Sequence, residues 1–157
     1  MLDLGMMERA RADAEEPEKL VLTDEAGEPY PVKDGESEPA FLMVKGADCK
    51  AVRAARRAAW ARLAVARREI KADDKLSEEE VDRRISEQME TLALDPEFRR
   101  PVATAAVADW GYVKDAGTPL DFNPENLSRL LAFERILGQV ERKMRAHEGF
   151  SRPRLKG

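Results

Sequence analysis

Two side chains in this sequence have the chemistry of a nucleophile or a zinc ligand: the thiol of Cys49 and the imidazole of His147. A thiolate beside an imidazole is the pair that cysteine enzymes use, and both groups also bind zinc. The chain has one residue of each type, far apart in the sequence, and neither stands in a recognisable motif. We therefore expect no zinc site and no catalytic pair, and we interpret Cys49 as a small residue near a helix start.

Carboxylates and glycines could also carry chemistry. Acid–base catalysis of glycosidase type needs two positioned carboxylates, but the acids here occur in runs such as 78–80, which helix capping and solvation explain. Gly111 and Gly117 lack the Gly-Lys-Ser/Thr sequence that holds phosphate and magnesium. The pattern indicates a protein that is not an enzyme and that needs no cofactor or metal.

Basic side chains are concentrated in the segment 50–71. They number eight in twenty-two residues: Lys50, Arg53, Arg56, Arg57, Arg62, Arg67, Arg68 and Lys71. On a helix they could form a solvated face, a contact face for an acidic partner protein, or a phosphate-binding face. The whole chain has a net charge of −4 and shows no helix-turn-helix pattern, so nucleic acid is the least favoured of the three.

In a helix over 50–71, the apolar residues at helical spacing include Ala59. Trp60 lies one position beside this apolar stripe, close to Arg56 and Arg57. An aromatic ring among arginines at a surface is a common anchor of protein interfaces, but the ring could equally cover the preceding strands. The candidate contact residues of this segment are Arg56, Arg57, Trp60, Leu63 and Arg67.

Charge is unevenly distributed along the chain. Residues 1–40 hold twelve acids and four bases, a net charge of −8, whereas residues 139–157 hold six bases and two acids. Either both ends are solvated, or they contact a charged partner or another copy of the chain in a homo-oligomer. The candidate residues of a second, basic contact patch are Arg142, Arg145, Arg152 and Arg154.

The composition suits a single domain of 157 residues. A charged fraction of 37% and an aromatic fraction of 6% favour helices that pack through small residues around a modest core. A lone cysteine fits a reducing compartment, the opening residues 1–4 do not resemble a signal peptide, and no run approaches the roughly 20 apolar residues of a membrane span. We expect a soluble intracellular protein that does not bind membranes.

The first 46 residues predict a short helix and a small β element. Residues 1–17 are highly charged, with an expected helix at 2–14, and the β element spans 18–46. Its expected parts are strands at 19–23 and 40–46, an extended stretch at 30–32 and a turn at 33–35. Two or three strands are not stable alone, so this β-meander or hairpin must pack on helices.

Residues 47–148 predict a helical domain, followed by a basic tail at 149–157. Asp48 is the expected N-cap of a helix that reaches residue 72. The apolar stripe of this helix is Val52, Ala55, Ala59, Leu63, Ala66 and Ile70. Further helices are expected after the caps Ser77 and Asp95 and from Pro124 to His147. The expected fold is mainly α (α+β), with the small N-terminal β-meander or hairpin packed on a bundle of about four helices.

The most informative part of the chain begins at Trp110. Asp115-Ala116-Gly117 predicts a turn, because glycine adopts positive φ without a Cβ clash. Asn123-Pro124-Glu125 predicts a helix start, with an N-cap, a first-turn proline and an acid at the positive end of the helix. We expect Trp110 to pack in the core beside Phe98 and Phe122.

This order of residues resembles the carboxy-terminal hallmark of phage tail assembly chaperones. The matching signature residues are Trp110, Gly111, Gly117, Pro119, Phe122 and Pro124. A second stretch, 44–57, resembles the family's strand, turn and Ala- and Arg-rich helix, with Cys49 where we expect serine. Together the two similarities span roughly 44–137.

The resemblance implies a protein of the host cell cytoplasm that is absent from the mature virion. Such chaperones bind the tape measure protein, keep it soluble and help recruit tail tube protein during tail morphogenesis. Two alternatives stay open: a small virion structural protein, such as a tail or head–tail completion factor, and a helical nucleic-acid-binding regulator. The first would be found in purified particles, and the second would bind DNA with a steep salt dependence.

Overall fold

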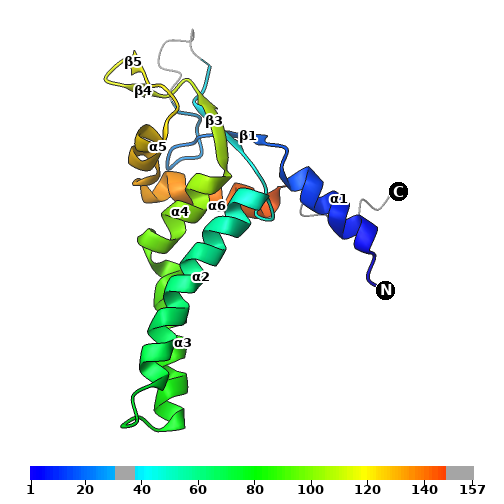
Figure 1. Cartoon of the computed structure of the whole chain (residues 1–157). Coiled ribbons are helices and arrows are strands. Elements are labelled where there is room, and N and C mark those ends of the chain that lie inside the picture. Colours follow the sequence, from blue (N-terminus) through cyan, green and yellow to red (C-terminus); the bar gives the residue numbers. More distant parts are fainter. Residues whose placement is uncertain (31–37, 148–157) are drawn as a thin grey trace.

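The computed structural model describes residues 1–30 and 38–147. Within them the elements are α1 Leu4–Ala14, β1 Glu18–Val21, β2 Phe41–Val44, α2 Lys50–Lys71, α3 Glu78–Leu94, α4 Pro96–Ala106, β3 Val107–Gly111, β4 Lys114–Asp115, β5 Thr118–Pro119, α5 Pro124–Leu131 and α6 Glu134–Ala146. Helices predominate over a small antiparallel sheet and a separate two-stranded hairpin (Figure 1). This confirms the expected mainly helical α+β class.

The three-stranded sheet has the order β1-β2-β3, and both pairings are antiparallel. In the middle strand, Leu42 pairs with Leu20 on one side and with Trp110 on the other. The third strand follows α4 directly, so the sheet is not confined to the expected β segment 18–46. The sequence did not indicate β3 because its five residues are too few to show a clear alternation, and its partner strand lies far earlier in the chain.

The hydrophobic core joins this sheet to α4, α5, α6 and the first turn of α2. Its largest fully buried side chains are Leu42, Val44, Cys49, Val52, Leu131, Leu137 and Val140. Cys49 packs among them as a small apolar residue at the start of a helix, in agreement with the sequence analysis.

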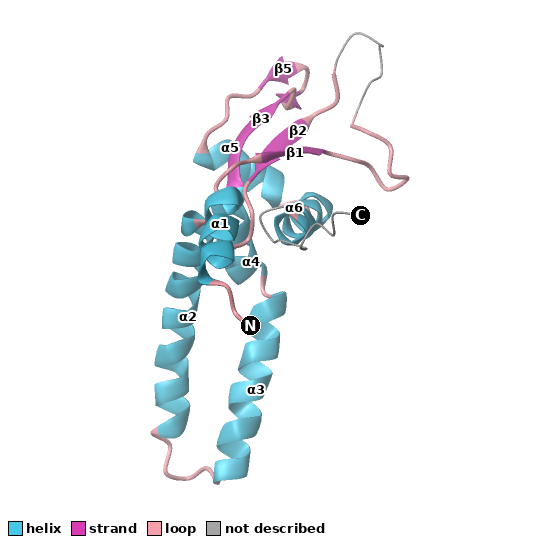
Figure 2. Ribbon diagram, turned by 90° about the vertical axis from the view of Figure 1, so that its right-hand side faces the viewer, coloured by secondary structure: helices cyan, strands magenta, loops and turns pink. Residues whose placement is uncertain are grey.

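Helices α2 and α3 form a hairpin that extends away from the rest of the molecule, as Figures 1 and 2 show. We call this hairpin the arm (residues 50–94). The expected stripe of α2 is its least exposed face, since Val52 and Leu63 are buried and the other four stripe residues are half-buried. In contrast, α3 contains no buried residue at all.

The helix starts were predicted with mixed success. Ser77 and Asp95 act as N-caps, because their side chains accept hydrogen bonds from the amides of Glu80 and Glu97. The prediction that Asp48 caps α2 is wrong. The N-cap position is Cys49, whose side chain makes no capping bond, and the Glu15 carboxylate at the end of α1 accepts from the amide of Lys50 instead.

The prediction of one continuous last helix from Pro124 to His147 is also wrong. The chain forms α5 and α6, which are separated at Ala132 and Phe133, and Phe133 has an extended backbone. The break lets two apolar faces of different orientation meet the core. Leu127 and Leu131 are buried from α5, and Ile136, Leu137, Val140 and Met144 are buried from α6.

The turn expected at 33–35, most of the extended stretch at 30–32 and the tail at 149–157 lie outside the described residues. Among the residues that the structure describes, none of the helices combines the length and the apolar composition of a membrane span.

Candidate protein-binding surfaces

Trp110 connects the sheet to the segment that follows it. Its side chain is buried, and its Nε1 donates a hydrogen bond to the carbonyl oxygen of Leu120 at 3.0 Å. Its ring packs edge-to-face with the ring of Phe122, and the two ring centroids are 5.4 Å apart. The predicted packing of Trp110 beside Phe122 is therefore confirmed. The predicted contact with Phe98 is wrong, because the Phe98 ring packs against the Trp60 ring instead, with the two ring centroids 6.1 Å apart.

The two signature glycines are required for different reasons. A Cβ at Gly111 would lie 2.3 Å from the ring of Phe41 in the neighbouring strand, so this position needs a residue without a side chain. Gly117 has a φ of +84° in the turn between β4 and β5, where a Cβ would have ample space but the backbone favours glycine. The turn predicted at 115–117 is thus confirmed.

The two signature prolines also have defined positions. Pro119 pairs with Lys114 in the β4–β5 hairpin. Pro124 is the first residue of α5, directly after Asn123, whose Oδ1 accepts a hydrogen bond from the amide of Asn126 at 2.8 Å. The predicted helix start is confirmed, and the whole signature segment has one ordered path from the sheet to α5.

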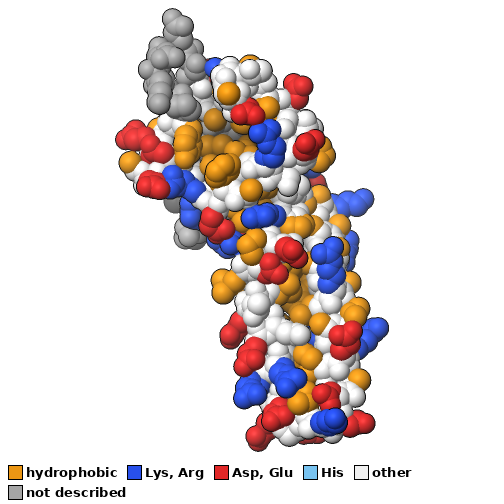
Figure 3. All heavy atoms as spheres, turned by 90° about the vertical axis from the view of Figure 1, so that its left-hand side faces the viewer, with side chains coloured by type: hydrophobic (Ala, Val, Ile, Leu, Met, Phe, Trp, Pro, Cys, Tyr) orange, Lys and Arg blue, Asp and Glu red, His pale blue; other side chains and the backbone are white. Residues whose placement is uncertain are grey.

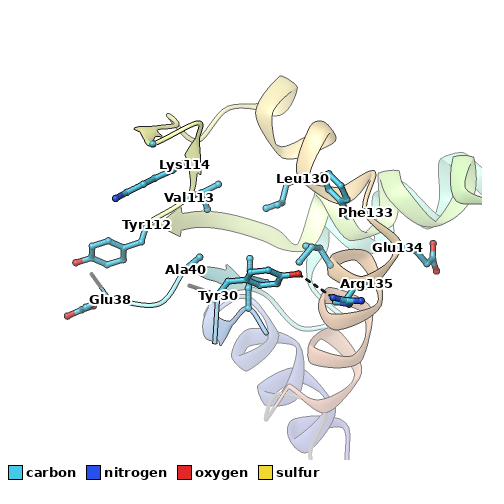
Figure 4. Close-up of a pocket in the computed structure, with 13 residues that line it drawn as sticks. Tyr30, Glu38, Ala40, Tyr112, Val113, Lys114, Leu130, Phe133, Glu134 and Arg135 are labelled. Atoms are coloured by element: carbon cyan, nitrogen blue, oxygen red, sulfur yellow. Dashed lines mark hydrogen bonds between the residues drawn. The ribbon is translucent and has the colours of Figure 1, made fainter. Parts of the chain in front are cut away.

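This path forms one wall of a cavity of about 750 Å³, which we call the apolar groove. It is lined by Leu22, Tyr30, Glu38, Ala40, Tyr112, Val113, Lys114, Gly117, Leu130, Phe133, Glu134, Arg135 and Ile136. Figure 4 shows Tyr112, Val113 and Lys114 on the hairpin side and Leu130, Phe133 and Arg135 on the helix side. Tyr112 is 50% exposed and Phe133 is 66% exposed, so two aromatic rings stand at the groove with much of their surface in water.

Charged groups are confined to the edge of the apolar groove. Arg135 donates a hydrogen bond to the hydroxyl of Tyr30 at 3.3 Å and forms an ion pair with Glu25. The bond to Glu25 raises the pKa of Arg135 above its ordinary value, although the group lies at the surface. Glu38 and Lys114 also line the cavity. An apolar floor with a charged rim is typical of a surface that binds an apolar segment of another protein.

The candidate contacts on α2 differ in their accessibility. Arg56 and Arg57 are exposed, and Trp60 is 44% exposed with one face against Phe98. Leu63 is only 6% exposed, because it packs inside the arm, so it cannot form part of a free surface. Arg67 is half-buried and its guanidinium lies 2.9 Å from the sulfur of Met89 on α3.

The basic patch predicted near the carboxy terminus is partly described. Arg142 and Arg145 are exposed on α6, whereas Arg152 and Arg154 lie outside the described residues. The structure brings Arg145 and Arg56 to the same small cavity of about 160 Å³, which Phe98 also lines. The two candidate basic patches therefore meet where α2 leaves the body.

The two residues considered first for chemistry are both buried. Cys49 is in the core, and His147 Nε2 lies 2.6 Å from the carbonyl oxygen of Glu16. Among the described residues no three histidine, cysteine, aspartate or glutamate side chains gather as metal ligands would. The arrangement of these two residues is that of buried packing.

The apolar groove was not predicted from the sequence. Its lining comes from several segments, and Phe133 stands at a helix break that the sequence did not reveal. The only signal available beforehand was the signature segment itself, which supplies Tyr112, Val113 and Gly117.

Comparisons of the chain with protein-family models, curated protein sequences and solved structures found no match.

Proposed function

We propose that this protein is a phage tail assembly chaperone that binds the tape measure protein, keeps it soluble and helps recruit tail tube subunits. The observation that carries the proposal is the position of the signature segment. The segment that carries the resemblance supplies one wall of the apolar groove, through the signature residue Gly117 and through Tyr112 and Val113, which lie within the same segment.

The apolar groove suits a client with long apolar stripes. A tape measure protein is expected to expose such stripes before the tail tube encloses it, and exposed stripes of this kind aggregate. Tyr112 and Phe133 can cover one of them, and burying a Phe-sized side chain contributes roughly 1.5–3 kcal/mol before the costs of association. A contact made by two such rings is small, which suits a client that tube subunits must later displace.

The test is co-expression of the chain with its tape measure protein. We expect the soluble fraction of the tape measure protein to rise and the two proteins to co-purify. The decisive variant is Tyr112→Asn with Phe133→Ser, which removes both exposed rings. Tyr112 has a φ of +59°, which asparagine tolerates, and Phe133 occupies an N-cap position, where serine is favoured.

This double variant should keep its fold and lose most of the rescue. The matched control is Val65→Ser, which removes an exposed apolar side chain of α2 that does not line the apolar groove. If the wild-type chain neither rescues nor binds the tape measure protein, the proposal is wrong. Presence of the chain in purified particles would then favour a virion structural protein.

A further inference from the structure

The arm is a two-helix layer whose second helix is not covered. No residue of α3 is buried, and its apolar face, which includes Val81, Ile85 and Leu92, is only half-buried. Helices in proteins are stabilised mainly by packing of an apolar face rather than by intrinsic propensity. The apolar faces that α2 and α3 turn toward each other, which we call the seam, therefore remain partly open to solvent.

The open side of the seam forms a second hollow, which we call the arm groove, of about 600 Å³. Its accessible apolar part consists of Ala66, Ile70 and Leu92, which lie beside the buried Leu63, and Arg62 and Glu87 also line it. Figure 3 shows hydrophobic side chains along the arm, flanked by charged ones of both signs. The arm groove thus offers an apolar strip that one or two further helices could cover.

Charge is separated along the length of the arm. Residues 50–62, at the base, hold five bases and no acid, a net charge of +5. Residues 69–82, which form the tip, hold seven acids and two bases, a net charge of −5. Within the described residues no ion pair joins α2 to α3. The opposite charges of base and tip therefore do not neutralise each other inside one chain.

We infer that the arm binds the arm of a second copy of this chain, in antiparallel orientation. A twofold axis across the middle of the arm places each acidic tip against the basic base of the other copy. The same operation lays the two arm grooves over each other, so that four helices enclose one apolar seam. Such an interface is self-complementary, as a twofold dimer requires, and it keeps the two bodies at opposite ends of the pair.

Two charge-reversal variants test this pairing. The tip variant carries Asp74→Lys, Glu79→Lys and Asp82→Lys, and the base variant carries Arg56→Glu, Arg57→Glu and Arg62→Glu. None of the six native side chains makes an ion pair or a side-chain hydrogen bond within the described chain, so their reversal breaks no such bond of the monomer.

The measurement is sedimentation equilibrium of the full chain. We expect the wild type to be a dimer, and each variant alone to dimerise at least about tenfold more weakly, because like charges then face each other at both ends. An equimolar mixture of the two variants should restore the dimer, since every facing pair is again opposite. A chain with all six substitutions should also dimerise with itself, which shows that the substituted arms still fold.

A wild-type chain that stays monomeric at about 100 µM overturns the inference. It is equally overturned if the dimer tolerates both variants unchanged, or if the mixture fails to associate although circular dichroism shows wild-type helicity for each. A wild-type monomer whose arm instead captures the tape measure protein would assign the arm groove to that partner. The inference is independent of the proposed function, because rescue of the tape measure protein does not require a dimer.

Discussion

The carboxylate of Glu15 accepts a hydrogen bond from the backbone amide of Lys50, with 2.5 Å between Oε1 and N. Glu15 is the C-cap residue of α1, and Lys50 is the first residue of α2. The side chain that satisfies the start of the longest helix thus comes from another helix. This bond, together with the nearby ammonium group of Lys45, lowers the pKa of Glu15 below its ordinary value of 4.5.

The first prediction concerns Glu15→Gln and pH. A carboxyl group whose pKa is lowered by folding stabilises the protein above its unfolded pKa, and this contribution is lost as the pH falls through the folded value. Because the group is largely solvated, we expect the substitution to cost only about 0.5–1 kcal/mol at pH 7. Urea unfolding should show the difference between the two proteins at pH 7, and this difference should shrink as the pH is lowered below 4.5. Glu16→Gln is the control, and an equal loss there would contradict the assignment.

The second prediction separates the two signature glycines. Gly111→Ala places a methyl group against the Phe41 ring, and such overpacking typically costs about 1–3 kcal/mol. Gly117→Ala meets no neighbouring atom but must adopt positive φ, which costs about 1 kcal/mol. Phe41→Leu should relieve the first substitution and leave the second unchanged, as measured by urea midpoints. Relief of both by the same change would show that the two costs share one cause.

The third prediction concerns Arg99, which joins α4 to α6. Its Nη2 lies 2.5 Å from Glu141 Oε1 and 2.6 Å from Glu134 Oε1, and these bonds, led by that of Glu141, raise the pKa of Arg99 above its ordinary value. Arg99→Met leaves the partly buried Glu141 without a cation, so we expect a loss of about 1–3 kcal/mol. Arg129→Met breaks the exposed pair with Asp115, which water and salt screen, and should cost much less than Arg99→Met. Equal losses in thermal unfolding would refute this ranking.

The fourth prediction concerns the indole nitrogen of Trp110. Trp110→Phe keeps a ring against Phe122 but removes the donor to the carbonyl oxygen of Leu120. We expect a loss of about 0.5–1.5 kcal/mol. Hydrogen exchange should also become faster at the amide of Leu120, which donates to Val113 across the hairpin. Unchanged exchange at Leu120 would mean that the indole bond does not hold the wall of the apolar groove.

The features that were predicted correctly depend on neighbours in the sequence. The α2 stripe repeats at helical spacing, and Ser77, Asp95 and Asn123 cap helices that begin within one to three residues. The turn at Gly117 is equally local, since it depends on the φ of that residue. In each case the physical cause lies within one helical turn, so the order of residues is sufficient to reveal it.

The features that were missed depend on contacts between distant segments. Strand β3 exists because it pairs with β2, and the bond from Lys50 to Glu15 exists because α1 ends beside the start of α2. The break at Phe133 lets α5 and α6 present separate faces to one core. The apolar groove also depends on distant segments, since its lining comes from residues just outside β1 and β2, from the region of the β4–β5 hairpin and from the break between α5 and α6.

The sequence by itself determined the helical class, the caps Ser77, Asp95 and Asn123, the turn at Gly117 and the opposite charges of the base and tip of the arm. Only the tertiary structure decided which of these features lie side by side. It buried Leu63 and left Phe133 exposed, although both are apolar residues of segments that the sequence predicted to be helical. The physical reason is that burial depends on what packs against a residue, and that neighbour is supplied by the fold and not by the adjacent sequence.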